Sequence, residues 1–151
     1  MNINDYRAKY DSAVINSDVK DQALFRCKHI LYYENLYKEV AAQTGVPWDV
    51  VGCIHSLEGE LNLLRHLHNG DFLTAKTENH PAGRPLVGKP PFTWVDSAVD
   101  ALSMFPRPLL WDLDVKLYFM ESYNGLGYVK LGINSPYLWA GTQHYTKGKF
   151  T

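Results

Sequence analysis

Apolar residues recur at helical spacing through much of the first third of the chain. Between residues 17 and 44 they repeat every three or four positions, after Ser17 and before Gly45. Residues three and four apart share one face of a helix, so this pattern predicts a long helix over about 17–44. A shorter helix over about 4–14 is expected before it, with Asn4 as its cap.

A third helix is predicted over about 47–59, where Pro47 suits the first turn. Its apolar stripe includes Val51 and Ile54 and ends on the carboxylate of Glu58. The helical period then disappears. The short run 66–74 contains Asn69-Gly70 between more apolar residues, which predicts a small β-hairpin. Residues 79–91 hold four prolines and two glycines and are expected to form a loop.

Three more helices are expected in the last third of the chain. One covers about 94–104, with Thr93 and Asp96 forming a capping box. Another runs over about 109–123 and ends at Asn124-Gly125, and a short one begins at Ser135-Pro136. The predicted fold is mainly α (α+β): one domain over 1–151 with a small β-hairpin region at about 60–91.

Composition narrows the function classes. The formal net charge is −1 and is spread evenly, whereas nucleic-acid binders usually carry a basic block. No apolar run approaches the roughly 20 residues of a membrane span. The polar first residues resemble no secretory signal, so synthesis in the cytoplasm is expected. Cys27 and Cys53 are expected to be two buried free thiols, with a disulfide between two helices as the alternative.

The aromatic content, 13%, is high for a nearly neutral domain. Aromatic side chains either fill a core or stack on flat ligands such as sugars. Four aromatic residues recur at helical spacing and are expected in the core: Phe25, Tyr33, Tyr37 and Trp111. The candidates for a sugar-facing wall are Tyr123, Tyr128, Tyr137 and Tyr145.

Two carboxylates suggest chemistry. Glu58 ends an apolar helix face, and Asp71 follows on a polar turn. Glycoside hydrolysis uses this asymmetry, because one carboxyl stays protonated in an apolar place while a second stays ionised in a wetter one. Spacing alone favours the alternative, in which Glu58 is a partly buried helix-end residue and Asp71 an ordinary turn residue.

Two segments resemble a known superfamily. Residues 46–58, VPWDVVGCIHSLE, resemble the helix that carries the catalytic glutamate in goose-type lysozymes and lytic transglycosylases, with Glu58 at that position. Residues 121–128, ESYNGLGY, resemble the AYNAGxG signature of the same proteins. The resemblance covers about residues 45–145 and implies a lysozyme-like fold, with the hairpin beside the cleft. One departure is Glu58-Gly59-Glu60, where the family usually has Glu-Ser-Gly.

The chain also resembles phage endolysin-type muramidases, in which a Thr lies six positions after the catalytic Asp, as Thr77 does after Asp71. These resemblances imply roles. Glu58 would be the general acid, and Asp71 would orient or activate water with the help of Thr77, or of Thr74 in its place. Tyr123 and Asn124 would contact the N-acetyl sugar nearest the scissile bond. Further expected contributors are Tyr128 and His68 in the cleft and Glu121 as a buried supporting acid.

The expected function is therefore a muramidase that cuts the β-1,4 bond between N-acetylmuramic acid and N-acetylglucosamine in peptidoglycan. Alternatives are a lytic transglycosylase, a chitinase-like glycosidase, and a non-catalytic peptidoglycan-binding module. No cofactor is expected. Zinc binding by His66 and His68 is disfavoured. The four histidines near the site, His55, His66, His68 and His80, are expected to be surface or cleft residues. A monomer that acts on the cell wall, as a phage endolysin, virion lysozyme or exported effector does, fits these features.

Overall fold

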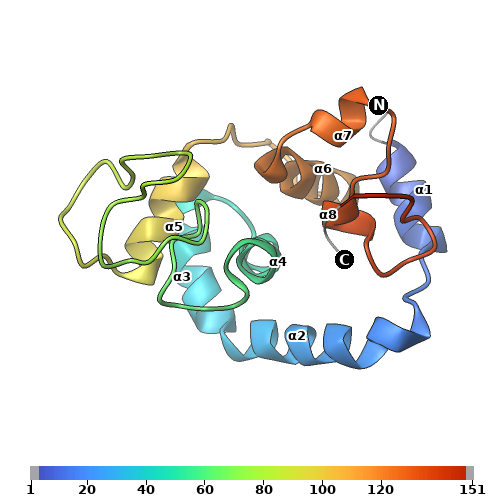
Figure 1. Cartoon of the computed structure of the whole chain (residues 1–151), viewed down its shortest axis with the longest axis horizontal. Helices are drawn as coiled ribbons and strands as arrows, with labels where there is room; N and C mark the ends of the chain where they lie inside the picture. The colour runs from blue at the N-terminus through green and yellow to red at the C-terminus, as the bar shows by residue number, and fades with distance from the viewer. Residues whose placement is uncertain (1–3, 149–151) are drawn as a thin grey trace. The chain divides into compact units, whose positions relative to one another are not determined.

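The computed structural model describes residues 4–148 and is mainly helical, with 53% of residues in helices. The chain divides into two compact units: Met1–Phe25 with Pro108–Thr151, and Arg26–Arg107. Each unit is described by itself below (Figure 1). The predicted mainly-α class is confirmed, whereas the single lysozyme-like domain stays a prediction. Among residues 4–148, no helix is both long and apolar enough to cross a bilayer.

The first unit is built around one longer helix near the C-terminal end of the chain. Its elements are α1 (Asn4–Ser12), the 3-10 turn η1 (Ser17–Val19), the start of α2 (Lys20–Tyr32), α6 (Leu113–Asn124), α7 (Gly127–Lys130) and α8 (Pro136–Trp139). Helix α6 packs against α1 and α8. The core between these helices contains Tyr6, Leu117 and Trp139.

Local chemistry explains where the helices of this unit begin and end. Helix α6 starts later than the predicted residue 109, because the Asp112 carboxylate accepts a hydrogen bond from the Val115 N–H and caps it there. The sequence predicts Leu110 on the inner stripe of this helix together with Leu113 and Leu117, but Leu110 lies before the helix and is exposed. Gly125 ends α6 with a φ of 93° and Ser135 caps α8, as predicted.

The second unit holds the remainder of α2, together with α3 (Glu34–Thr44), α4 (Trp48–Gly59) and α5 (Trp94–Ser103). Helix α3 packs against both α4 and α5. Gly52 lets α4 approach its neighbours closely, since a Cβ at this position would lie 2.6 Å from Cγ2 of Ile30 and 3.0 Å from the ring of Tyr37. Tyr37 is fully buried, as predicted. The capping bond from the Asp96 N–H to Thr93 is also confirmed.

The single helix predicted over 17–44 is wrong in one respect, because it breaks at Tyr33. The Tyr33 N–H bonds to the Ile30 carbonyl at 3.1 Å, a tighter turn than an α-helix makes. The chain then continues as α3. Helix α2 buries none of its residues, and Phe25 is 66% exposed, so its predicted place in the core is wrong.

Residues 60–93 form a long loop that lies beside α5 (Figure 1). The predicted hairpin is reduced to an isolated antiparallel bridge between Arg65 and Phe72. The chain does reverse at Asn69-Gly70, where the His66 N–H donates to the Asp71 carbonyl at 2.6 Å. No strand forms in the described part of the chain. Cys27 and Cys53 form no disulfide, and Cys27 is exposed rather than buried.

Candidate functional site

Glu58 lies in the last turn of α4, a helix that is otherwise largely buried. Its own side chain is partly exposed, whereas most α4 side chains around it are not. The buried residues of this helix are Val50, Val51, Gly52, Ile54, His55, Ser56 and Gly59. The predicted position of Glu58, at the end of an apolar helix face, is therefore confirmed.

The chain turns sharply directly after Glu58. Glu60 and Leu61 adopt left-handed conformations, with φ values of 51° and 61°. Such a conformation costs a non-glycine residue about 1–2 kcal/mol, because Cβ crowds the following carbonyl. The N–H groups of both residues donate to the backbone carbonyl of His55, and the Asn62 N–H donates to Gly59. These contacts hold a strained turn next to the candidate acid.

His55 is fully buried beneath this turn. Its Nε2 donates to the Asn62 carbonyl at 3.2 Å, and its Nδ1 accepts from the Tyr37 hydroxyl at 2.8 Å. Because a carbonyl can only accept, the first contact requires a proton on Nε2, and in the neutral ring Nδ1 is then the acceptor for the Tyr37 hydroxyl. Its ring lies 4.6 Å from that of Trp94, and burial lowers the pKa of His55 to about 4. His55 is therefore neutral at pH 7.

Asp71 organises the loop that follows. Its carboxylate accepts hydrogen bonds from the N–H groups of Glu78 and Asn79 and from the side-chain amides of Asn69 and Asn79, at 2.8–3.1 Å. Desolvation alone would raise the pKa of Asp71, but these donors outweigh it and hold the pKa below its usual value. Asp71 is thus an ionised carboxylate whose hydrogen-bond partners belong to its own loop.

The loop around Asp71 touches the end of α4. A Cβ placed on Gly70 would lie 3.3 Å from the backbone carbonyl oxygen of Glu58. The residue next to Asp71 in the chain therefore lies close enough to the backbone of Glu58 that a side chain there would crowd it. The structure places the two predicted carboxylates on adjoining segments of one unit.

Thr77, the predicted partner of Asp71, is buried inside the same loop. Its hydroxyl donates to the Pro81 carbonyl at 2.5 Å and accepts from the Arg84 N–H at 2.9 Å. Only a second oxygen lone pair is left with which Thr77 could hold a water molecule. The alternative residue, Thr74, is exposed.

His68, predicted to contact substrate, has a fully buried side chain. Its Nε2 lies 2.6 Å from Oδ2 of Asp100 on α5, and the same oxygen accepts from Nε of Arg84 at 2.9 Å. Burial lowers the pKa of His68 despite the carboxylate, so the contact is a neutral N–H donating to a charged acceptor. The His68 Nδ1 atom is buried and has no hydrogen-bond partner in the structure.

The prediction that the histidines near the site are surface or cleft residues is wrong for His55, His66 and His68, all of which are buried. His66 uses both ring nitrogens, on Ser97 and on the Ala75 carbonyl, each at 2.7 Å. It therefore has no free nitrogen for zinc. Within residues 4–148, no group of three His, Cys, Asp or Glu side chains is arranged to hold a metal ion.

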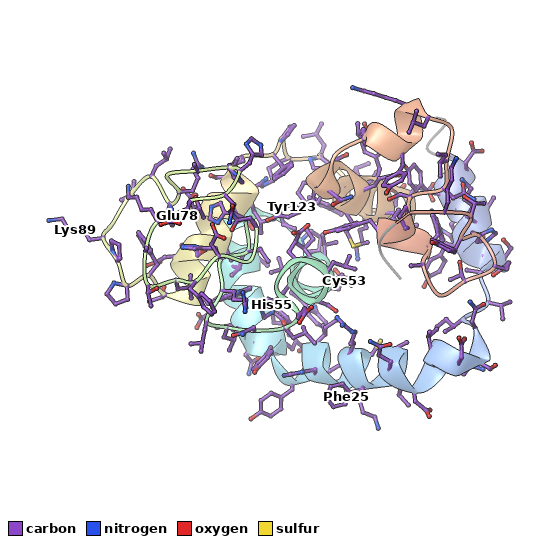
Figure 2. All side chains as sticks on the ribbon, viewed as in Figure 1. Phe25, Cys53, His55, Glu78, Lys89 and Tyr123 are labelled. Atoms are coloured by element: carbon purple, nitrogen blue, oxygen red, sulfur yellow. The ribbon has the colours of Figure 1, made fainter. Side chains whose placement is uncertain are left out.

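The remaining predicted site residues belong to the first unit. Tyr123 and Asn124 are partly buried in the last turn of α6, and Tyr128 is partly buried in α7 (Tyr123 is labelled in Figure 2). Their expected contacts with a sugar stay predictions. Tyr137, an expected member of the sugar-facing wall, is buried at 3% exposure and cannot serve there.

Glu121 is buried in the same unit, where the Tyr6 hydroxyl donates to its carboxylate. Burial raises the pKa of Glu121, against the opposing effect of the hydrogen bond from Tyr6. The predicted burial of this acid is confirmed, and its identified partner lies on α1.

Sequence reasoning missed two residues that support the loop and the turn, namely His55 as a buried bridge and Asp100 as an anchor. Figure 2 shows His55 on α4, with Glu78 and Lys89 on the long loop. Asp100 lies 32 positions from His68 and 16 from Arg84, at spacings that no local pattern would join. For His55 the sequence offered one sign: it is a polar residue within a helix whose neighbouring positions are mostly apolar. The chain matches no protein-family model, and no curated protein or solved structure shows significant similarity to it.

Proposed function

We propose that this chain is a glycoside hydrolase of peptidoglycan, a muramidase that cleaves the β-1,4 bond between N-acetylmuramic acid and N-acetylglucosamine. The observation that carries the proposal is the pairing of Glu58 with the Asp71 loop. Glu58 lies at the end of a buried helix, and Gly70 of the loop lies against its backbone. Two carboxyl groups in unlike surroundings on adjoining segments are what acid-catalysed glycoside cleavage needs.

Glu58 is the proposed general acid. The partial negative charge at a helix C-terminus and the apolar residues of α4 both disfavour a second negative charge there. A neutral carboxyl in that place can donate its proton to the glycosidic oxygen as the bond breaks. This proton makes the sugar a better leaving group.

Asp71 has a different proposed role. Its lowered pKa makes it a weak base, because a general base works best with a pKa near the working pH. Its fixed negative charge can instead stabilise the positive charge that develops on the sugar ring in the transition state. Tyr123, Asn124 and Tyr128 remain candidate sugar contacts by resemblance to lysozyme-like proteins.

The hydrogen bonds around Asp71 also favour a second candidate function, that of a lytic transglycosylase. That reaction needs no activated water, and the Asp71 carboxylate is engaged with its own loop. The products distinguish the two: hydrolysis leaves reducing ends, and transglycosylation leaves 1,6-anhydro ends.

The test compares Glu58→Gln with Glu60→Gln on purified cell-wall sacculi, with released fragments identified by mass spectrometry. Both changes replace a carboxylate by its amide, two positions apart, and the Glu60 side chain is exposed. We expect Glu58→Gln to lower the rate by roughly 10²–10⁴-fold, the usual contribution of a general acid, and Glu60→Gln to retain it. Full activity of Glu58→Gln would overturn the assignment.

Two further arms of the experiment test for a binding module and for a chitinase-like enzyme. Binding of the wild-type protein to sacculi without any released fragment would identify a non-catalytic binding module. Cleavage of colloidal chitin at a rate equal to that of sacculi would identify a chitinase-like enzyme.

A further inference from the structure

The turn after Glu58 is held by one buried side chain. His55 precedes Glu58 by one helical turn, and Asn62 follows it by four residues. The bond from Nε2 of His55 to the Asn62 carbonyl therefore closes a ring of chain that contains Glu58. The backbone carbonyl of His55 also accepts from Glu60 and Leu61. One residue thus contacts the chain at three successive positions of the turn.

The orientation of this histidine is itself fixed from outside α4. The Tyr37 hydroxyl on α3 donates to Nδ1, which places the ring proton on Nε2, where it faces Asn62. The Trp94 ring on α5 packs against the imidazole, and a Cβ on Gly59 would lie 3.3 Å from Cδ2 of His55. Three helices of one unit therefore determine where the His55 ring lies.

The turn needs such support because its own conformation is unfavourable. Glu60 and Leu61 are consecutive non-glycine residues with positive φ, and such strain persists only where the surroundings hold it. Without a partner for the Asn62 carbonyl, the segment could relax toward ordinary φ values. Glu58 is the last partly exposed residue of α4 before this segment, so relaxation would move its backbone.

We propose that His55 is a positioning residue: through the Tyr37–His55–Asn62 bridge it holds the left-handed turn that fixes Glu58. The structural part of this proposal concerns the turn alone, and the functional part rests on the proposed role of Glu58. His55 itself touches no reacting atom in this scheme. It acts through the backbone that carries the acid.

The test uses the full chain with His55→Leu, His55→Gln and Tyr37→Phe. Leucine removes both ring bonds, glutamine keeps a side-chain donor, and phenylalanine removes only the donor to Nδ1. Val51→Ala is the control, since it loosens the fully buried core of α4 without touching the turn. Amide hydrogen exchange is measured at Glu60, Leu61 and Asn62, and kcat and KM are measured on soluble peptidoglycan fragments.

In His55→Leu we expect exchange at the three turn amides to rise at least tenfold relative to the α3 core amides. We expect kcat to fall at least tenfold with little change in KM, and His55→Gln to restore part of both. Val51→Ala should raise exchange at the turn amides no more than at the α3 core amides, and it should leave kcat unchanged. If His55→Leu does not fold, the same shifts, smaller in size, are expected in His55→Gln and Tyr37→Phe.

The outcomes separate the two proposals. If amide exchange at Glu60, Leu61 and Asn62 is unchanged in the folded variants, the positioning role is overturned, whatever the activity. Loosened turn amides with full kcat would overturn the link between the turn and catalysis. Loosened amides in a protein whose wild type cleaves no glycan would support the bridge and refute the proposed function.

Discussion

Gly70 lies against the backbone of Glu58. A Cβ on Gly70 would sit 3.3 Å from the Glu58 carbonyl oxygen, and Gly70 has a φ of +85°. Two constraints therefore require glycine here: a left-handed conformation and a close approach between two segments. The loop that carries Asp71 can reach the end of α4 because this residue has no side chain.

Replacing Gly70 by alanine should disturb both features. We expect Gly70→Ala to lower the free energy of unfolding by about 2 kcal/mol, from the positive φ together with the crowded Cβ. Gly83→Ala is the matched control, because Gly83 has a φ of +77° but nothing within 4 Å of its Cβ position. It should lose only about 1 kcal/mol. Equal losses in urea unfolding would show that the contact with Glu58 contributes nothing.

Because His55 is buried in its neutral form, we expect the free energy of unfolding to depend on pH. The pKa of His55 is about 4 in the folded protein and 6.5 in its ordinary state. The unfolded chain therefore binds the proton more readily between these values, and stability falls as the pH drops from 6.5 to 4. The shift corresponds to a loss of about 3 kcal/mol.

His68, whose pKa is also lowered, adds to this acid sensitivity with the same sign. The contribution of His55 is isolated by urea unfolding of the wild type and His55→Gln at pH 7 and pH 4. The variant should lose less stability than the wild type over this interval. Identical losses would contradict a neutral, buried His55.

Asp71 should stabilise its loop wherever it is ionised. Asparagine at position 71 would keep only one acceptor oxygen, and its NH₂ group would face the N–H donors of Glu78 and Asn79, so donor would meet donor. We expect Asp71→Asn to lower the free energy of unfolding by about 1–2 kcal/mol and to speed proteolysis within residues 72–91. Glu78→Gln is the control, because the Glu78 side chain is exposed and only its backbone binds Asp71. Equal effects of the two changes would count against the carboxylate as the organiser.

Local sequence patterns predicted the ends of several elements. The capping bond at Thr93, the glycine stop at Gly125 and the cap at Ser135 all depend on residues within three positions of one another. The break at Tyr33 could not be found in this way. Apolar spacing continues through it, and the break is visible only in the structure, in the bond from the Tyr33 N–H to the Ile30 carbonyl and in the burial of Tyr37 but not of Phe25.

The Asn69-Gly70 reversal was also foreseen, but the strands beside it were not formed. The Asp71 side chain binds residues 78 and 79 instead, and the flanking chain joins the long loop rather than a ladder. At the candidate site, the position of Glu58 followed from helical periodicity. Tyr37, which orients His55, and Asp100, which binds His68, lie 18 and 32 positions from these histidines, so both contacts depend on tertiary packing that no single-sequence period encodes.

For Glu121, in the first unit, we expect the free energy of unfolding to depend on pH in the opposite direction. Burial raises its pKa above the ordinary value, so its contribution to stability is full at low pH and is lost as the pH rises through the folded pKa. Glu121→Gln removes the charge and keeps an acceptor for the Tyr6 hydroxyl. We expect the variant to gain stability relative to the wild type as the pH rises from the ordinary value of 4.5 upward, measured by urea unfolding. A constant difference across this range would contradict the raised pKa.

Asp100 should anchor the long loop to α5. Its carboxylate accepts from Nε2 of His68 at 2.6 Å, from Nε of Arg84 at 2.9 Å and from the Leu86 N–H at 3.2 Å. Asparagine would remove the charge beside Arg84 and replace an acceptor by a donor. We expect Asp100→Asn to lower the free energy of unfolding by about 2–3 kcal/mol, as expected when a partly buried charged acceptor is lost.

Asp96→Asn provides the comparison for this change, because Asp96 lies on the same helix with an exposed side chain. It should change stability by less than about 1 kcal/mol, the usual contribution of a carboxylate in the first turn of a helix. Limited proteolysis should then cut within residues 76–91 of Asp100→Asn faster than in either the wild type or Asp96→Asn, since three contacts between loop and helix are weakened together. A destabilised Asp100→Asn whose loop is cut no faster than that of Asp96→Asn would show that the carboxylate stabilises α5 but does not hold the loop.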